Sequence, residues 1–266
     1  MEDHDPMAEP APTLWLKSIT QIVIPARLAS TRLPRKLLLD ETGKSLLRHT
    51  YEAASRATKP VDICVATDHQ EIAAEVHRFG GRVEMTDPDA ASGTDRVAEV
   101  AQRLSGVDII VNVQGDEPEL SGQSIDLIIG LLERRPEAVM STLATPIRSR
   151  RQLNDPACVK VVFDSNDRAL YFSRSPIPHV RDWDDSLLTA HPARFYQHVG
   201  LYAYRREFLL KLGRMPRSTL EKMENLEQLR VLSAGYVIAV GVVDEPTAGI
   251  DTQDDYRAFV RRTLGR

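Results

Sequence analysis

The sequence has little cysteine, no excess of positive charge and no long apolar run. Cys64 and Cys158 are the only two cysteines in 266 residues, which excludes a disulfide scaffold and predicts free thiols in a reducing compartment. The net charge of −4 argues against a general nucleic-acid-binding protein. No segment approaches the roughly 20 apolar residues of a membrane-spanning helix. We therefore expect a cytoplasmic protein with neither nucleic-acid binding nor membrane insertion.

The first residues, MEDHDPMAEPAPT, are acidic and rich in proline and alanine. They lack the charged-then-apolar order of a signal peptide, and they predict a disordered N-terminal tail over residues 1–18. Residues 19–266 suffice for one large α/β domain. Their composition is typical of a globular protein, because 42% of the whole chain is apolar and 27% is charged.

Short apolar runs alternate with segments of helical periodicity. ITQIVIPA, VDICVATD and VDIIVNVQGD predict buried strands, and the segments between them place apolar residues three or four positions apart. This alternation indicates a Rossmann-like, mostly parallel sheet with helices on both faces. The alternation breaks at about residue 155, where CVKVVFD and RFYQHVGLYAYRR predict strands around the loop YFSRSPIPHVRDWDD. We expect a smaller antiparallel subdomain inserted at about 155–205. A helix across ENLEQLRVLSAG, a strand YVIAVGVV and a final helix from Thr252 then follow.

Glycine is scarce in the turn after the first strand, PARLASTRLPRK. The turn lacks the glycine fingerprints of P-loop and dinucleotide-binding proteins, but it carries Arg27, Arg32, Arg35 and Lys36. Guanidinium groups bind phosphate through two parallel hydrogen bonds, and lysine adds a point charge. Because ligands of parallel sheets bind at the carboxyl ends of the strands, the turn predicts a polyphosphate site. The alternative is a solvated loop with scattered charges.

Acidic residues follow other predicted strands. Asp116, Glu117 and Glu119 lie in VNVQGDEPE, and Asp251 lies in GIDTQDD. Carboxylates beside a phosphate repel it unless a divalent cation lies between them, and Mg²⁺ typically uses one or two carboxylates plus substrate phosphates. Asp116 and Asp251 are the better ligand candidates. The alternatives are that Asp116 caps a turn and that Asp251 starts a helix. With the basic turn, the two aspartates suggest metal-assisted phosphoryl or nucleotidyl transfer.

Eight short segments then carry a resemblance to a known family. They are PARLASTRLPRK, ATDH, SGTDR, VNVQGDEP, YFSR, QHVGLYAYRREFL, LEQLR and GIDT, in that order. Together they resemble the 3-deoxy-D-manno-octulosonate (Kdo) cytidylyltransferases, over residues 19–262. The resemblance implies a nucleotidyltransferase fold, the reaction of CTP with Kdo to give CMP-Kdo and pyrophosphate for lipopolysaccharide synthesis, Mg²⁺ as cofactor and a homodimer.

The resemblance also implies roles for particular residues. Lys36, Arg27 and Asp116 would be catalytic, and Asp116 and Asp251 would bind the metal. The nucleotide would contact Arg27, Arg32, Lys36, Ser92, Gly93, Arg96 and Gln114. The sugar would contact Arg174, His198, Tyr202, Glu227 and Gln228. The simpler interpretations are a structural ion pair for Arg174, a sheet histidine for His198, and a solvated helix face for Glu227 and Gln228.

Two departures from the family pattern stand out. The family loop usually reads Leu-Pro-Gly-Lys, and Arg35 here replaces the glycine, which permits backbone conformations that arginine disfavours. Ala90 or Ala91 stands where a polar residue or histidine commonly precedes SGT. The alternatives to Kdo activation are CMP transfer to a related acid sugar, such as amino-Kdo or a sialic acid, and a non-catalytic nucleotide-binding homologue.

Overall fold

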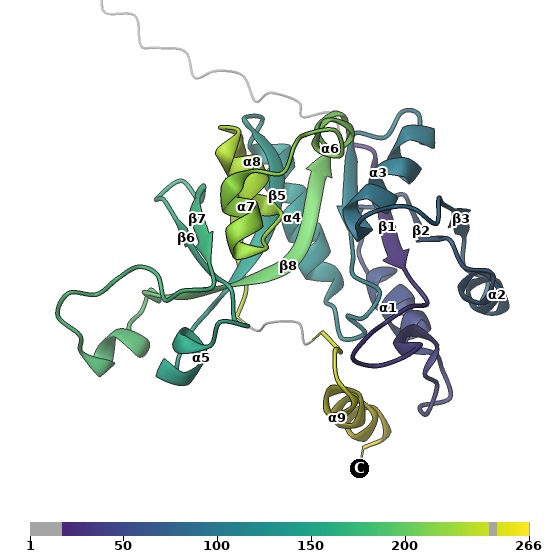
Figure 1. Cartoon of the computed structure of the whole chain (residues 1–266), viewed down its shortest axis with the longest axis horizontal. Helices are drawn as coiled ribbons and strands as arrows, with labels where there is room; N and C mark the ends of the chain where they lie inside the picture. The colour runs from purple at the N-terminus through teal and green to yellow at the C-terminus, as the bar shows by residue number, and fades with distance from the viewer. Residues whose placement is uncertain (1–17, 245–248, 266) are drawn as a thin grey trace, which may run out of the picture.

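The computed structural model describes residues 18–244 and 249–265, so the predicted tail lies outside the described residues except for Ser18. The centre of the described structure is a nine-stranded sheet (Figure 1). Seven strands follow one another in the order β3-β2-β1-β4-β8-β5-β9, while β6 pairs with β7 and β8 outside this order. The strands are β1 (Thr20–Ala26), β2 (Asp62–Thr67), β3 (Val83–Met85), β4 (Ile109–Asn112), β5 (Ala138–Pro146), β6 (Lys160–Phe163), β7 (Ala169–Ser173), β8 (Tyr196–Arg205) and β9 (Val237–Val242).

Helices cover both faces of this sheet, as the sequence predicts. Alternate residues of β1 point to opposite faces: Ile22 and Ile24 join one apolar cluster, and Val23 joins the other. The helices are α1 (Leu46–Ala54), α2 (Gln70–Arg78), α3 (Gly93–Arg103), α4 (Gly122–Arg134), α5 (Arg150–Asn154), α6 (Arg206–Leu212), α7 (Thr219–Glu224), α8 (Gln228–Ser233) and α9 (Gln253–Leu264), with short 3₁₀ turns η1 (Lys36–Leu38) and η2 (Asp185–Leu188). Helices α1, α2, α4 and α9 pack in the first cluster, and α3, α6 and α8 pack in the second.

The place of β8 differs from the expectation of an antiparallel subdomain over 155–205. β8 lies inside the main sheet, antiparallel to both β4 and β5, while β6 and β7 form the antiparallel pair beside it. Val199, Leu201 and Ala203 enter the first apolar cluster, so burial in the main core places β8 in the central sheet. The division of the chain into one domain with an insertion stays a prediction.

The helix expected across ENLEQLRVLSAG is also interrupted. α7 ends at Glu224, Asn225 adopts a left-handed conformation at φ 52°, and α8 begins at Gln228. Strand β7 lies partly in the segment that was predicted as a loop, and β3, α5 and α6 are short elements without a predicted counterpart. In the described part of the chain, no helix combines the length and the apolar character that crossing a bilayer requires.

Candidate active site

Lys36 lies where three distant segments of the chain meet. Its ammonium donates hydrogen bonds to Asp116 Oδ2, to Asp251 Oδ1 at 3.0 Å and to the carbonyl of Ile250 at 3.1 Å. Lys36 follows β1, Asp116 follows β4, and Asp251 precedes α9. The Ile250 N–H donates to the Asp116 carbonyl at 2.9 Å, which joins the two acidic segments. The structure thus brings the basic turn and both predicted aspartates to one point.

The last helix leaves the carboxylate of Asp251 available. Thr252 caps α9 with its side chain, so Asp251 is not needed for helix capping. Asp251 instead contacts Lys36 with one oxygen and Arg32 Nη2 with the other, at 2.9 Å. Helix α9 is attached to the first half of the chain, where the Tyr256 hydroxyl accepts a hydrogen bond from the Glu41 N–H at 3.0 Å.

The surroundings of Lys36 fit a cation site. Burial opposes the charge of the ammonium, but hydrogen bonds and the charges of Asp116 and Asp251 outweigh burial and raise the pKa of Lys36. The lysine therefore stays protonated and acts as a stand-in cation between two converging carboxylates. Among the described residues no group of three or more acidic, histidine or cysteine side chains forms a metal cage. Two carboxylates suit Mg²⁺ that shares its coordination with substrate phosphates.

The other cations of the turn have separate partners. Arg27 Nη2 donates to the carbonyl of Ala90 at 2.9 Å, so that alanine supplies a backbone contact where the family has a polar side chain. Arg35 forms an exposed ion pair with Glu71. Its φ of 55° lies in the left-handed region, so the backbone keeps a conformation that glycine would adopt without strain. The replacement of the family glycine by Arg35 therefore leaves the left-handed backbone conformation of this turn in place.

A pocket of about 680 Å³ opens beside the turn, which is within the usual size range of ligand sites. Its lining includes Arg27, Asp68 and Arg96. Ser92 caps α3 by accepting a hydrogen bond from its third residue, and a Cβ added at Gly93 would lie 3.5 Å from Cγ of Pro25. Of the predicted nucleotide residues, Arg27 and Arg96 line this pocket, whereas Lys36 and Arg32 lie at the adjacent carboxylate cluster.

Arg96 is almost completely buried, although its side chain is charged. It is 1% exposed, and its guanidinium contacts Thr86 and, at 3.2 Å, Asp68. Its Nε is buried without a hydrogen-bond partner in the structure. A buried donor without a partner is costly, and the terminal guanidinium nitrogens contact Thr86 and Asp68 and so fix Arg96 at this end of the pocket. Gln114 lies in the turn after β4, where its amide donates to Asn112 at 3.4 Å.

The predicted sugar residues gather in a second pocket of about 410 Å³. His198, Tyr202, Glu227 and Gln228 line it together, whereas Arg174 is not among its lining residues. The side chains of β8 point to alternate faces of the sheet: His198 and Tyr202 line this pocket, and Val199 packs in the first apolar cluster. The simpler interpretation, in which Glu227 and Gln228 form a solvated helix face, is wrong, because Gln228 is 4% exposed.

Burial disfavours the charged forms of the titratable side chains that line this second pocket. Burial lowers the pKa of His198 to about 3, so its imidazole is neutral at pH 7. Burial also raises the pKa of Glu227, and it raises the pKa of Tyr202, with smaller contributions from nearby glutamates. No lysine or arginine is among the residues that line the pocket. The site is therefore suited to recognising hydroxyl and amide groups.

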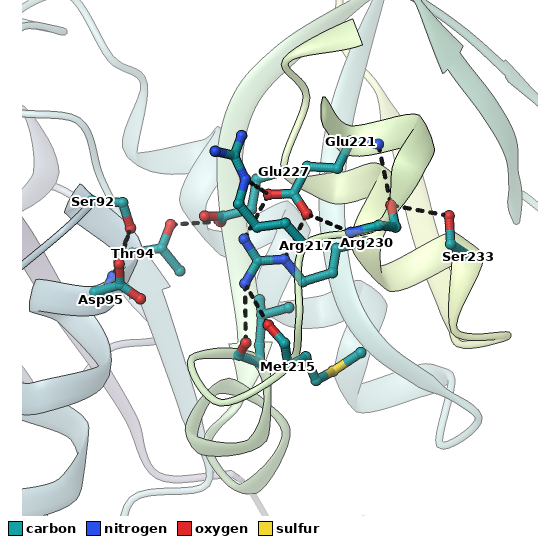
Figure 2. A network of polar contacts seen from close by, with 11 residues as sticks. Ser92, Thr94, Asp95, Met215, Arg217, Glu221, Glu227, Arg230 and Ser233 are labelled. Atoms are coloured by element: carbon teal, nitrogen blue, oxygen red, sulfur yellow. Dashed lines mark hydrogen bonds and ion pairs between the residues drawn. The ribbon is translucent and has the colours of Figure 1, made fainter. Parts of the chain in front are cut away.

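A polar network holds the helices behind this pocket (Figure 2). Arg230 donates to both carboxylate oxygens of Glu221, at 2.8 and 2.6 Å, and so ties α8 to α7. Thr94 Oγ1 donates to Glu227 Oε1 at 2.7 Å, which connects the start of α3 with the sugar pocket. Arg174 belongs to the same structural layer, since its guanidinium donates to the Glu224 and Pro156 carbonyls at 2.8 and 3.0 Å.

Several residues of these sites carried no signal in the sequence. Thr94 lies in the SGTDR segment but was not singled out, and Thr142 and Tyr204 lie in strands that predict only core packing. Their positions depend on which strands become neighbours, and β8 is inserted between β4 and β5. Asp68 is the last residue of the predicted strand VDICVATD, and it pairs with the buried Arg96.

Comparison with known proteins places this geometry in a family. The family model for cytidylyltransferases matches residues 21–239. A 3-deoxy-manno-octulosonate cytidylyltransferase from Rhodopirellula baltica is 50% identical over 242 residues, which cover 91% of this chain and 97% of that protein. The chain belongs to the 3-deoxy-manno-octulosonate cytidylyltransferase family. This membership confirms the resemblance inferred from the eight sequence segments, and with it the prediction of a cytidylyltransferase.

Two further similarities bear on the ligands. A solved structure of CMP:2-keto-3-deoxy-manno-octonic acid synthetase in complex with CTP superposes with a TM-score of 0.86 at 39% identity, covering 93% of this chain and 99% of that chain. An 8-amino-3,8-dideoxy-manno-octulosonate cytidylyltransferase from Shewanella baltica is 43% identical over 244 residues, which cover 91% of this chain and 97% of that protein. The agreement with the solved structure confirms the predicted α/β fold class.

Proposed function

We propose that this member of the family activates Kdo with CTP and releases pyrophosphate. The observation that carries the proposal is the convergence of Lys36, Asp116 and Asp251 beside a nucleotide-sized pocket that Arg96 of α3 lines. Thr94 of the same helix lines a second pocket, which no lysine or arginine lines. The Rhodopirellula baltica relative, which shares the chain over most of its length, carries this activity in its name. The solved structure that is similar to this chain holds CTP.

In the proposed reaction the anomeric hydroxyl of Kdo attacks the α-phosphorus of CTP. A new P–O bond forms to the sugar, the bond to the β-phosphate oxygen breaks, and pyrophosphate leaves with that electron pair. Arg27 and Lys36 would hold the phosphates, with Arg32 beside them, and these fixed positive charges would stabilise the charge that develops on the phosphate oxygens. The hydroxyl proton passes to water as the bond forms.

Mg²⁺ would be held by Asp116 and Asp251. When bound, it would supply Lewis-acid stabilisation of the phosphate oxygens. If Asp116 and Asp251 held the metal, the Lys36 ammonium would be free to bind a phosphate oxygen of the same substrate. Homodimerisation and a cytoplasmic location stay predictions from the sequence.

The test is pyrophosphate release by the purified protein with CTP, Mg²⁺ and a panel of acid sugars. We expect Kdo to be the best sugar substrate. We also expect UTP and ATP to be used poorly in place of CTP. The Shewanella baltica relative makes 8-amino-Kdo the second candidate, and a sialic acid completes the panel. Equal use of CTP and UTP would contradict the nucleotide assignment, a preference for 8-amino-Kdo would favour the second candidate, and no release with any sugar would favour a non-catalytic homologue.

A further inference from the structure

Strand β8 is irregular opposite one residue of β5. Ser141 pairs with Ala203 and Leu143 pairs with Val199, so Thr142 alone faces the intervening stretch of β8. Such bulges leave backbone groups out of the ladder and often re-aim side chains next to active sites. The hydroxyl of Thr142 lies 3.0 Å from the carbonyl oxygens of both Val199 and Leu201. Thr142 is fully buried, and its hydroxyl is a donor to these oxygens.

The same hydroxyl contacts the imidazole of His198. Thr142 Oγ1 lies 2.9 Å from His198 Nε2. A threonine hydroxyl has one proton and two acceptor lone pairs, and two carbonyl oxygens already compete for that proton. If the proton pointed to the imidazole instead, the hydroxyl oxygen would face two carbonyl oxygens with no hydrogen between them. Thr142 therefore accepts a hydrogen bond from Nε2–H, which leaves Nδ1 without a proton in the neutral ring.

The ring is also fixed by packing. Phe172 contacts it edge-on with 5.0 Å between ring centroids, and Tyr202 lies 5.5 Å away. His198 nonetheless lines the 410 Å³ pocket. Gln228 lines the same pocket, and its amide nitrogen is buried without a hydrogen-bond partner. The contacts of His198 therefore place an oriented imidazole at this pocket.

We infer that Thr142 is a positioning residue of the sugar pocket: it holds His198 as the Nε2–H tautomer, so that Nδ1 accepts a hydrogen bond from a sugar hydroxyl. This inference rests on the proposed function for the identity of the ligand, but the tautomer itself does not depend on it. It assigns His198 to recognition of a hydroxyl rather than of the sugar carboxylate, since a neutral acceptor repels a carboxylate oxygen.

The tautomer can be measured directly in the wild-type protein. Long-range ¹H–¹⁵N spectra of uniformly ¹⁵N-labelled protein at pH 7 distinguish a protonated from an unprotonated ring nitrogen, and His198→Gln identifies the resonances. We expect a protonated Nε2 and an unprotonated Nδ1. A protonated Nδ1 would overturn the inference. The spectrum requires neither turnover nor a variant at Thr142, so it decides the matter even if such variants fold poorly.

Steady-state kinetics test the consequence for the sugar. Thr142→Val removes the hydroxyl at nearly constant shape, and we expect the KM for the sugar to rise by about three- to tenfold, the cost of one hydrogen bond. The KM for CTP should change by less than about twofold. Thr142→Ser keeps the hydroxyl and should restore the sugar KM. Thr145→Val is the matched control, because Thr145 lies on the same strand and its hydroxyl donates to the Asp244 carbonyl at 3.2 Å.

Two kinetic outcomes would contradict the inference. One is a Thr142→Val enzyme that behaves like Thr145→Val, and the other is a rise in the KM values of both substrates that Thr142→Ser does not reverse. If the wild-type enzyme released no pyrophosphate with CTP and any sugar, the proposed function would fail, and the tautomer measurement would still stand as a separate result.

Discussion

Two lysines in different regions of this molecule hold their ammonium groups in opposite ways. Lys36, after β1, faces two carboxylates and one carbonyl at a partly open site. Lys160, in β6, is fully buried and donates to three backbone carbonyls, those of Asp155 at 2.9 Å, Cys158 at 2.6 Å and Arg174. The pKa of Lys36 is raised, whereas burial lowers the pKa of Lys160.

The hydrogen-bond partners of the two ammonium groups show which lysine is suited to function and which to structure. Carboxylates that attract an ammonium also attract a metal ion, so the partners of Lys36 can exchange one cation for another. Three carbonyls from two chain segments use all three protons of the Lys160 ammonium, and they leave nothing for a ligand. We therefore expect Lys36 to matter for turnover and Lys160 to matter for folding.

The largest effect expected is on turnover in Lys36→Ala. Removing a charge contact made in the transition state costs about 2.7–4 kcal/mol, judged by single oxyanion-type donors, so kcat/KM should fall about a hundredfold or more. The measurement is pyrophosphate release at saturating Mg²⁺. Lys44→Ala is the control, since Lys44 forms a half-exposed ion pair with Glu52 and should retain activity. Near-wild-type kcat/KM in Lys36→Ala would end the distinction between the two lysines.

The reverse pattern is expected for Lys160→Met. The substitution keeps the apolar stem but leaves three buried carbonyls without their donor, and one such loss costs about 1–3 kcal/mol. With three carbonyls affected, we expect a loss near the upper end, about 3 kcal/mol, in the free energy of unfolding by urea. Unchanged stability combined with lost turnover would contradict the structural role.

A third buried group, His198, sharpens the comparison through its pH dependence. Its pKa is about 3 in the folded protein against 6.5 for an ordinary histidine, so only the unfolded chain binds the proton between these values. Stability should therefore fall as the pH drops below 6.5, by about 2 kcal/mol at pH 5 from this group alone. Urea unfolding of wild type and His198→Gln at pH 7 and pH 5 isolates the contribution. An equal acid loss in both proteins would show that His198 does not contribute.

The smallest effect is expected at Arg35, the exposed cation next to Lys36. Its ion pair with Glu71 is open to solvent, and such pairs contribute little. Arg35→Ala should therefore lower kcat/KM by less than about fivefold. Arg35→Gly removes the strain of the left-handed backbone and should melt at a higher temperature than Arg35→Ala. A larger kinetic loss for Arg35→Ala than for Lys36→Ala would reverse the proposed roles within this turn.

The sequence predicted the surroundings of Lys36 well and the surroundings of Lys160 hardly at all. Lys36, Asp116 and Asp251 follow or precede elements of regular α/β periodicity, and the rule that ligands bind at strand ends brings them together. Lys160 reads as one polar residue in an apolar strand, and nothing local shows that three carbonyls will surround it. The contact of Thr142 with His198 depends on β8 lying next to β5, a pairing between residues more than 50 positions apart that periodicity does not encode. Arg174 seemed a sugar ligand for its charge, yet packing places its guanidinium against backbone carbonyls.

The central claim is that Asp116 and Asp251 form one cation site for CTP-dependent transfer. It is tested most directly by measuring pyrophosphate release at saturating CTP and Kdo while Mg²⁺ is raised, for wild type, Asp116→Asn and Asp251→Asn. The account predicts that wild-type turnover stops in excess chelator, that Asp116→Asn loses metal-dependent turnover while it remains folded, and that Asp251→Asn requires more Mg²⁺ than wild type. Full turnover of Asp116→Asn, or wild-type turnover undiminished by chelator, would contradict it.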